Sequence, residues 1–428
     1  MRSGKEMVML VLVAVLLGVV SGLSPASDNQ SSQRWWKSMF SGTSSSAVVN
    51  PIGSSVVLPM YGNVHPIGSY YVQLKVGNQP KPYFLDPDTG SDLTWLHCEP
   101  CRGCPKGPHP FYRPSNDLVA YRDPLCASLH SSEDYKCDDP ERCAYELEYA
   151  DGGSTGLLVK DILSLDLTNG IPVSHRVAIG CGYNQTQWSS YHHPLDGVLG
   201  LGKGKTSIVS QLQNQGLVRN VVGHCLSGRG GGFLFFGDYV YDSSQVVWTP
   251  MSPDYSHYSP GYAELTIGGK GIGHKNILVL FDTGSSYTYL NSQAYQAFIY
   301  SLRKELSGKP LREEPNDKTL PLCWKGKKPF KNVLDAKKHF KPLALTFSNG
   351  WRAKSQFEIP PEAYLIISSK GNICLGILNG SEAGLENENI VGDISMQDKM
   401  VIYDNEKQTM GWVSTSCDRP PTSKASFM

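Results

Sequence analysis

The sequence has no surplus of charge and few charged residues in total. Its 39 lysine and arginine residues balance 39 aspartate and glutamate residues, and charged residues make up 18% of the chain. A nucleic-acid partner is not expected, because attraction to phosphate backbones depends on a basic surplus. The 43 glycines, 28 prolines and 22 tyrosines favour many short strands joined by turns over long charged helices.

The sequence also lacks a hydrophobic run that is long enough to span a membrane. Its longest apolar run, Met7–Val20, has 14 residues and would reach about 21 Å as a helix, against roughly 30 Å for a hydrocarbon core. Arg2 and Lys5 precede this run and small residues follow it, which predicts a signal peptide over residues 1–22. An uncleaved anchor holding a structural domain at the cell surface is the competing interpretation. We expect cleavage, no stable membrane span afterwards, and a secreted (extracellular) or vacuolar protein.

Cysteine, by contrast, is abundant. Six of the eleven cysteines fall within residues 98–143, and Cys98, Cys101 and Cys104 have the spacing of a zinc or iron–sulfur loop. Behind a signal peptide, disulfides are the favoured interpretation, so residues 98–143 are expected to be an insertion closed by disulfides. Because eleven is odd, at least one thiol is free or pairs elsewhere. Asn184 and Asn379 begin glycosylation sequons that fit the same compartment.

The rest of the chain divides into two halves of similar pattern. Residues 23–65 are rich in serine and glycine and are interpreted as a pro-segment or flexible lead-in. An N-terminal lobe is predicted for 66–250, a C-terminal lobe for 251–418 and a flexible tail for 419–428.

A short motif occurs once in each half. Asp88-Thr89-Gly90-Ser91 and Asp282-Thr283-Gly284-Ser285 each follow an apolar strand pattern, and the two aspartates are 194 residues apart. In each half a later apolar strand with an embedded glycine follows, at Leu195–Gly202 and Asn389–Ile394. One such motif is weak evidence, but two in matching contexts predict a duplicated lobe that brings Asp88 and Asp282 together.

Two carboxylates held this close share one proton, because each charge disfavours ionisation of the other. One can then act as a general base on a bound water while the protonated partner hydrogen-bonds a substrate carbonyl. The threonines are expected to bond across the interface, and the glycines and serines to donate to the carboxylates. The pattern predicts amide hydrolysis at acidic pH without a covalent intermediate, a metal or a cofactor.

The two motifs, the hairpin around Tyr149 and the Ile390-Val391-Gly392-Asp393 stretch resemble the pepsin family of aspartic proteases. The six-cysteine insertion resembles the plant nepenthesin-type branch. Three further stretches resemble plant nucellin-like proteases: Gly223–Ser227, Leu322–Gly326 and Gln397–Glu406. The resemblance covers residues 65 to 418. It implies an all-β, bilobal fold with an active-site cleft between two pseudo-symmetric lobes.

The resemblance also implies roles for individual residues. Tyr149 corresponds to the flap tyrosine that closes over bound peptide, Trp95 to the tryptophan that hydrogen-bonds it, and Cys323 and Cys374 to a disulfide of the second lobe. Two positions depart from the family pattern. Pro87 stands before the first aspartate in place of an aliphatic residue, and Tyr121 stands where relatives carry a cysteine.

The expected function is therefore that of a monomeric aspartic endopeptidase acting on peptides or proteins. The alternative is a catalytically impaired binding or inhibitor protein of the same fold, and Pro87 is the main observation in its favour, because proline fixes φ and removes a backbone donor.

Overall fold

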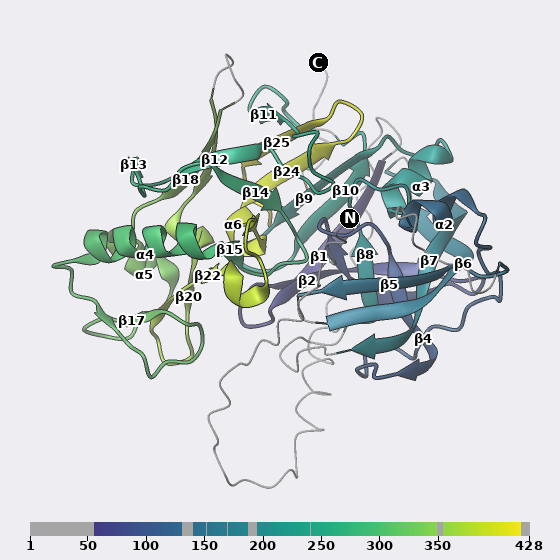
Figure 1. The fold of residues 1–428 in the computed structure, drawn as a ribbon, viewed down its shortest axis with the longest axis horizontal. Helices are drawn as coiled ribbons and strands as arrows, with labels where there is room; N and C mark the ends of the chain where they lie inside the picture. The colour runs from purple at the N-terminus through teal and green to yellow at the C-terminus, as the bar shows by residue number, and fades with distance from the viewer. Residues whose placement is uncertain are drawn as a thin grey trace, which may run out of the picture.

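The computed structural model describes residues 55–130, 140–150, 152–168, 170–186, 195–239, 241–348 and 354–420. Strands dominate, and they form two lobes, with β4–β7 at one end of the molecule and α4 and β17 at the other (Figure 1). The all-β, bilobal prediction is confirmed. The signal peptide and tail predicted at the two ends lie outside the described residues, apart from Arg419 and Pro420.

The largest sheet has 13 strands and runs from the first lobe into the last residues of the chain. Its order is β11-β25-β24-β9-β10-β1-β2-β3-β8-β4-β7-β6-β5. The bounds of these strands are β1 Ser55–Asn63, β2 Ser69–Val76, β3 Lys81–Asp88, β4 Trp95–Arg102, β5 Ala144–Tyr149, β6 Gly152–Asp166, β7 Pro172–Thr186, β8 Gly197–Gly200, β9 Val221–Leu226, β10 Gly232–Gly237, β11 Val247–Pro250, β24 Lys399–Asp404 and β25 Thr409–Ser414.

Strand β1 corrects one prediction. The lead-in expected over residues 23–65 does not extend to 65, because Ser55–Asn63 pairs with β10 on one side and β2 on the other. The signal was present in the apolar run Val56-Val57-Leu58, where Val56 and Val57 are buried. Residues 23–54 lie outside the described part of the chain.

A second sheet of eight strands forms the centre of the C-terminal lobe. Its path is β19-β18-β12-β14-β23-β15-β22, and β13 pairs with β12 at the side. The bounds are β12 Gly261–Ile267, β13 Lys270–Gly271, β14 Ile277–Phe281, β15 Thr288–Leu290, β18 Leu343–Phe347, β19 Ser355–Ile359, β22 Ile377–Asn379 and β23 Asn389–Val391.

The duplication is visible in the strands that carry the two motifs. Strand β3 pairs in parallel with β8, and β14 pairs in parallel with β23. The following glycines lie at equivalent points. A Cβ on Gly200 would meet the Asp92 carbonyl oxygen at 2.3 Å, and one on Gly392 would meet the Tyr287 carbonyl oxygen at 2.1 Å. Glycine is therefore required in both halves, where one chain segment crosses the loop after an aspartate.

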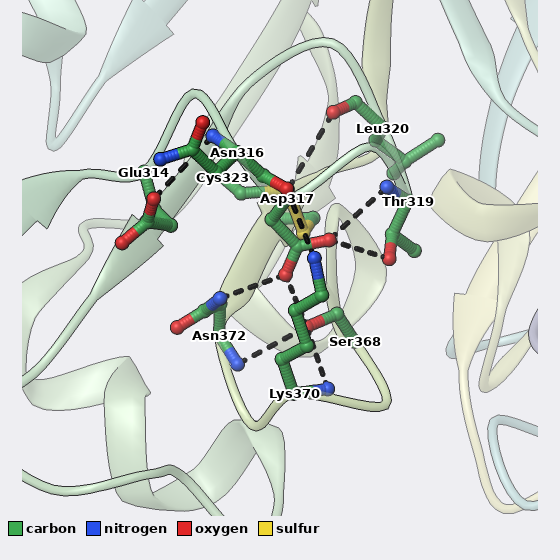
Figure 2. Close-up of a disulfide and its surroundings, with 10 residues drawn as sticks. Glu314, Asn316, Asp317, Thr319, Leu320, Cys323, Ser368, Lys370 and Asn372 are labelled. Atoms are coloured by element: carbon green, nitrogen blue, oxygen red, sulfur yellow. Dashed lines mark hydrogen bonds between the residues drawn. A yellow bond between two sulfur atoms is a disulfide. The ribbon is translucent and has the colours of Figure 1, made fainter. Parts of the chain in front are cut away.

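A third sheet, at the outer end of the C-terminal lobe, has the order β16-β17-β21-β20. Its strands are β16 Arg312–Glu313, β17 Cys323–Lys325, β20 Leu365–Ile367 and β21 Ile373–Leu375. The Cys323–Cys374 disulfide joins β17 to β21. Beside it, the buried Asp317 carboxylate accepts hydrogen bonds from Ser368, Asn372 and Thr319 (Figure 2).

Helices are short, with one exception, and lie around the sheets. Helix α4 begins after Asn291, whose side chain accepts from the Ala294 N–H at 3.0 Å, and its buried residues recur on one face towards the core. The bounds are α2 Pro124–Leu129, α3 Ile208–Asn214, α4 Ser292–Leu306, α5 Val333–Ala336 and α6 Asp393–Met396, with 3₁₀ turns η1 Lys337–His339, η2 Pro361–Ala363 and η3 Gly380–Ala383. No helix of the described residues is long and apolar enough to cross a bilayer.

Five disulfides account for ten of the eleven cysteines, and Cys137 lies outside the described residues. Cys98, Cys101 and Cys104, which also had the spacing of a metal loop, are all disulfide-bonded. The pairs are Cys98–Cys181, Cys101–Cys104, Cys126–Cys143, Cys225–Cys417 and Cys323–Cys374. The insertion is thus closed internally and is also tied to β7 through Cys181.

Candidate active site

The structure brings Asp88 and Asp282 together at the junction of the two lobes. Asp88 ends β3 and Asp282 follows β14 directly. A Cβ on Gly90 would lie 2.6 Å from Asp282 Oδ1, and one on Gly284 would lie 2.6 Å from Asp88 Oδ1. Each glycine therefore faces the opposite aspartate, and any side chain at either position would displace a carboxylate.

The two loops use the same hydrogen bonds. The Gly90 N–H donates to Asp88 Oδ1 at 2.7 Å, and the Gly284 N–H donates to Asp282 Oδ1 at 2.9 Å. The Ser285 hydroxyl donates to Asp282 Oδ2 at 2.6 Å, and the Ser91 hydroxyl donates to Asp88 Oδ2. These bonds hold both oxygens of each carboxyl group, so the orientation of each carboxyl group is fixed.

Thr89 and Thr283 lock the loops to each other. Each threonine N–H donates to the other's hydroxyl oxygen at 3.0 Å. Each hydroxyl then donates across the interface to the carbonyl before the opposite aspartate, from Thr283 to Pro87 at 2.5 Å and from Thr89 to Phe281 at 3.1 Å. Both side chains are buried, so this four-bond lock is shielded from water.

Pro87 fits the first loop without breaking this symmetry. The β2–β3 pairing ends at Val72↔Leu85, before Pro87 is reached. On the β8 side, the Phe84 and Asp88 carbonyls accept hydrogen bonds from the Asp196 and Leu201 N–H groups. Because backbone groups alternate in direction along a strand, the nitrogen and carbonyl of Pro87 point away from β8. The missing N–H therefore costs no ladder hydrogen bond, and the Pro87 carbonyl is used by Thr283.

The electrostatics of the pair favour a shared proton. Asp88 is 6% exposed. Burial, followed by the charge of Asp282, raises the pKa of Asp88, and the bonds from Ser91 and Gly90 only partly oppose the rise. One proton is therefore retained on the pair under conditions in which an isolated aspartate would have lost it.

Two more carboxyl groups lie close to this pair and were not among the predicted site residues. Asp393 begins α6 and is 2% exposed, and its Oδ1 has no hydrogen-bond partner within the described residues. Burial, then the charges of Asp86, Asp282 and Asp88, raise the pKa of Asp393. Asp86 could have been found by strand alternation, since it is two residues before Asp88, and Asp393 by its place after Gly392 in the duplicated strand.

A cleft of about 670 Å³ opens over the aspartates. Tyr149, at the end of β5, lines it and accepts a hydrogen bond from Trp95 Nε1 at 2.8 Å. Strands β5 and β6 form a hairpin, with Tyr149 paired to Gly152 at its tip. Burial, then the charge of Asp88, raise the pKa of the Tyr149 hydroxyl, so it stays protonated as a donor. Glu148, Ser256, His257 and Glu388 also line the cleft, and no pattern in the sequence pointed to them.

The remaining predicted residues lie away from the cleft. Asn184 is in β7 and is half-buried. Asn379 precedes η3, where its carboxamide oxygen accepts from the Ser381 N–H and its nitrogen donates to Glu382. Cys323 and Cys374 belong to the outer sheet. Tyr121, at the position of the relatives' cysteine, packs at the edge of a cluster that contains Trp95 and Cys126.

Comparison with known proteins places this geometry in a family. Models described as the xylanase inhibitor N-terminal and C-terminal regions match residues 70–238 and 266–414. An aspartic proteinase of rice (Oryza sativa subsp. japonica) is 43% identical over 390 residues, covering 88% of this chain and 95% of the relative. Aspartic proteinase 39 of Arabidopsis thaliana is 28% identical over 389 residues, covering 85% and 78%.

Solved structures agree on the fold. Basic 7S globulin from soybean superposes with a TM-score of 0.66 at 17% identity, covering 85% of this chain and 98% of the globulin. At that identity the likeness concerns the fold alone. The extent of the family match and the 43% identity with the rice relative show that this chain belongs to the plant family of pepsin-type, xylanase-inhibitor-like aspartic proteases.

Proposed function

We propose that the protein is an aspartic endopeptidase that hydrolyses peptide bonds at acidic pH through a water activated by Asp88 and Asp282. The observation that carries this proposal is the paired, mirror-related hydrogen bonding of the two carboxyl groups at the floor of the cleft. The fold alone would not suffice, since folds host both active and inactive members.

In the proposed mechanism, the shared proton divides the roles of the two aspartates. The ionised carboxylate removes a proton from a water held between the pair, and the protonated partner donates a hydrogen bond to the scissile carbonyl oxygen. The water oxygen attacks the carbonyl carbon. The proton taken from the water is then transferred to the leaving amine as the C–N bond breaks. Tyr149, positioned by Trp95, closes over the peptide and restricts bulk water.

The supporting residues act by positioning. Gly90 and Gly284 leave room for the opposite carboxylates, Ser91 and Ser285 orient them, and the threonine lock holds the two loops at a fixed separation. Asp393 sits behind the pair with no partner for its Oδ1 in the described part of the chain, and its protonated form limits the total negative charge beneath the cleft.

The test is cleavage of a denatured protein at pH 3–5 by purified, processed protein, with and without a statine-type inhibitor. We expect inhibitable cleavage, and its loss in Asp282→Asn. Asp166→Asn, an exposed aspartate of β6, is the matched control and should retain full activity. Cleavage that survives in Asp282→Asn at the wild-type rate would contradict the proposal.

A second candidate is a binding or inhibitor protein that has lost catalysis. The match to models described as xylanase inhibitor regions favours it. A folded, processed chain that shows no cleavage over the whole acid range, and that binds a target protein, would support this candidate.

We also propose a route through the secretory pathway to the cell exterior, the apoplast or the vacuole, as a monomer. Five disulfides support an oxidising compartment. Cleavage after residue 22 and glycan addition at Asn184 or Asn379 are part of this proposal. N-terminal sequencing and deglycosylation shifts of the secreted protein test them.

A further inference from the structure

The chain is neutral overall, but its charge is not evenly distributed. Residues 318–341 contain eight lysines and one acidic residue, Asp335, which leaves a net charge of +7 in a segment of 24 residues. The remainder of the chain must therefore carry −7. The lysines are Lys318, Lys325, Lys327, Lys328, Lys331, Lys337, Lys338 and Lys341, and we call their surface the lysine face.

Most of this charge is exposed and unneutralised. Seven of the eight lysines are exposed and Lys341 is half-buried. Two form ion pairs, Lys337 with Glu362 at 3.0 Å and Lys341 with Glu305 at 2.5 Å. The other six have no ion pair with any described residue. Asp335 makes no ion pair with a described residue, and its carboxylate accepts the backbone N–H of Lys331, so it lowers the net charge of the segment to +7 without pairing with any one lysine.

The backbone that carries the lysine face is held in place by a disulfide and by hydrogen bonds. Strand β17 is tied to β21 by the Cys323–Cys374 disulfide. The loop after β17 is held by the Phe330 N–H, which donates to the Gly371 carbonyl at 2.8 Å. The Asp317 carboxylate also holds the turn that contains Gly371, because it accepts hydrogen bonds from the side chains of Ser368 and Asn372 (Figure 2). Positive charges held in place lose less entropy on binding than charges on a mobile loop.

The positive charges of the lysine face also affect a histidine within it. Burial, then the positive charges of Lys338 and Lys309, lower the pKa of His339. A bound anion would relieve this repulsion. The face lies away from the cleft: β17 and α5 are at the outer end of the C-terminal lobe (Figure 1), and no residue of 318–341 lines the cleft.

The chemistry of the face limits which anion it suits. Residues 318–341 contain no arginine, and the exposed Arg312 lies opposite Lys325 in the neighbouring strand β16, so the fork that recognises phosphate in two-point contacts is available at β16 but not among the eight lysines. Trp324 and Phe340 are buried and cannot stack on bases, and Leu334 alone presents a large apolar side chain, at 58% exposure. Nucleic acid and membrane are therefore poor matches. Several separate, exposed ammonium groups suit a flexible polymer that carries many carboxylates.

We propose that the lysine face binds a carboxylated polysaccharide, independently of the catalytic cleft. Such a polymer is a chemically suitable partner in an oxidising, extracellular compartment, and its binding would hold the protein on a polyanionic matrix while the cleft stays open to substrate. Attraction is electrostatic, so binding weakens as salt rises.

The test measures binding of the full processed protein to polygalacturonate at pH 6, with dextran as the neutral polymer. Lys327→Gln/Lys328→Gln/Lys331→Gln removes three charges of the face. We expect affinity for polygalacturonate at ~50 mM salt to fall by at least about tenfold, with a shallower salt dependence, because each lysine that neutralises a polymer charge releases condensed counterions.

Two matched variants make the outcome specific. Lys75→Gln/Lys106→Gln/Lys205→Gln removes three exposed lysines elsewhere and should bind as wild type does. The triple lysine-to-arginine variant at 327, 328 and 331 keeps the charge and should also bind. Folding of every variant is checked by thermal unfolding, and since binding is read without cleavage, the result does not depend on the proposed function.

Three results would overturn the proposal. The first is no retention of the wild-type protein on polygalacturonate at ~50 mM salt. The second is equal loss in the face variant and the control variant. The third is tighter wild-type binding to RNA or to phosphatidylserine vesicles than to polygalacturonate, which would assign the face to a different class of partner.

Discussion

Replacing Asp317 by alanine tests whether the outer sheet of the C-terminal lobe depends on one buried carboxylate. Asp317 is 3% exposed and receives four hydrogen bonds. Ser368 and Asn372 donate to Oδ2 at 2.5 and 2.7 Å, and the N–H and hydroxyl of Thr319 donate to Oδ1 at 3.1 and 2.7 Å. The substitution leaves all four donors without this acceptor.

The expected magnitude follows from these bonds. A hydrogen bond to a charged acceptor contributes about 1.5–3 kcal/mol, but bonds that share one acceptor do not add. We therefore expect Asp317→Ala to lower the free energy of unfolding by about 3–5 kcal/mol, the range seen when one partner of a buried charged network is removed. Asp335→Ala, which removes one long contact to a backbone N–H, is the control and should change it by less than about 0.5 kcal/mol.

The pH dependence gives a second, independent check. Burial opposes ionisation of Asp317, but the bonds from Ser368, Asn372 and Thr319 outweigh it and hold its pKa far below the usual range. A depressed pKa contributes stability that is complete above the unfolded value of about 3.9 and is lost as pH falls towards the folded value. The wild-type advantage over Asp317→Ala should be constant above pH 5, shrink by less than about 1 kcal/mol at pH 3.5, and shrink by about 2 kcal/mol at pH 2.5.

Urea unfolding at pH 6, 3.5 and 2.5, followed by tryptophan fluorescence, measures these differences. Trp324, in β17 next to Cys323, reports on the affected sheet. An advantage that stays constant down to pH 2.5 would show that the pKa is not depressed, and a loss below about 1 kcal/mol at pH 6 would show that the network is not needed. The expected profile would keep this sheet intact in the acid range of the proposed reaction.

Three further substitutions test other parts of the structure. Burial lowers the pKa of His97 to about 4, and the charge of Asp196 offsets this only in part. As pH falls from 7 to 4 the unfolded wild-type chain therefore takes up a proton at His97 more readily than the folded chain, so the free energy of unfolding of His97→Phe should rise by about 3 kcal/mol relative to wild type over this range. A stability difference between variant and wild type that is equal at pH 7 and pH 4 in thermal unfolding would contradict this. Thr283→Val leaves the Thr89 N–H without its acceptor and should lower kcat at least about tenfold, whereas Thr283→Ser keeps the hydroxyl and should keep most activity. Equal rates of peptide cleavage by the valine variant and the wild type would show that the threonine lock is not needed for catalysis. Pro87→Val should leave kcat within about threefold, because no ladder hydrogen bond is regained, and a gain above tenfold would show that the proline distorts the first loop.

Much of the site could be predicted because its signals are local. The Asp-Thr-Gly-Ser loops, the strands that deliver them and the hairpin that carries Tyr149 each occupy one continuous stretch. The duplication then implied that two such stretches meet. The later apolar strands expected at Leu195–Gly202 and Asn389–Ile394 contain β8 and β23.

What could not be predicted depends on contacts between distant segments. The Asp317 network joins residues about fifty positions apart, and no motif marks it. Strand β1 was missed because a serine- and glycine-rich stretch precedes it, and its partner β10 lies far along the chain. The basic run at 318–341 is visible in the sequence, but a balanced total charge concealed it until the exposure of its lysines was known.

The place of the final hairpin has a consequence for synthesis of the chain. Strand β24 pairs with β9, and Cys417 is bonded to Cys225, 192 residues earlier. At ribosomal rates of about 5–20 residues per second, β9 waits roughly 10–40 s before these partners exist. During that interval one edge of the first sheet is open to pairing with other chains. The nascent protein therefore cannot complete its largest sheet until β24 and β25 have been made.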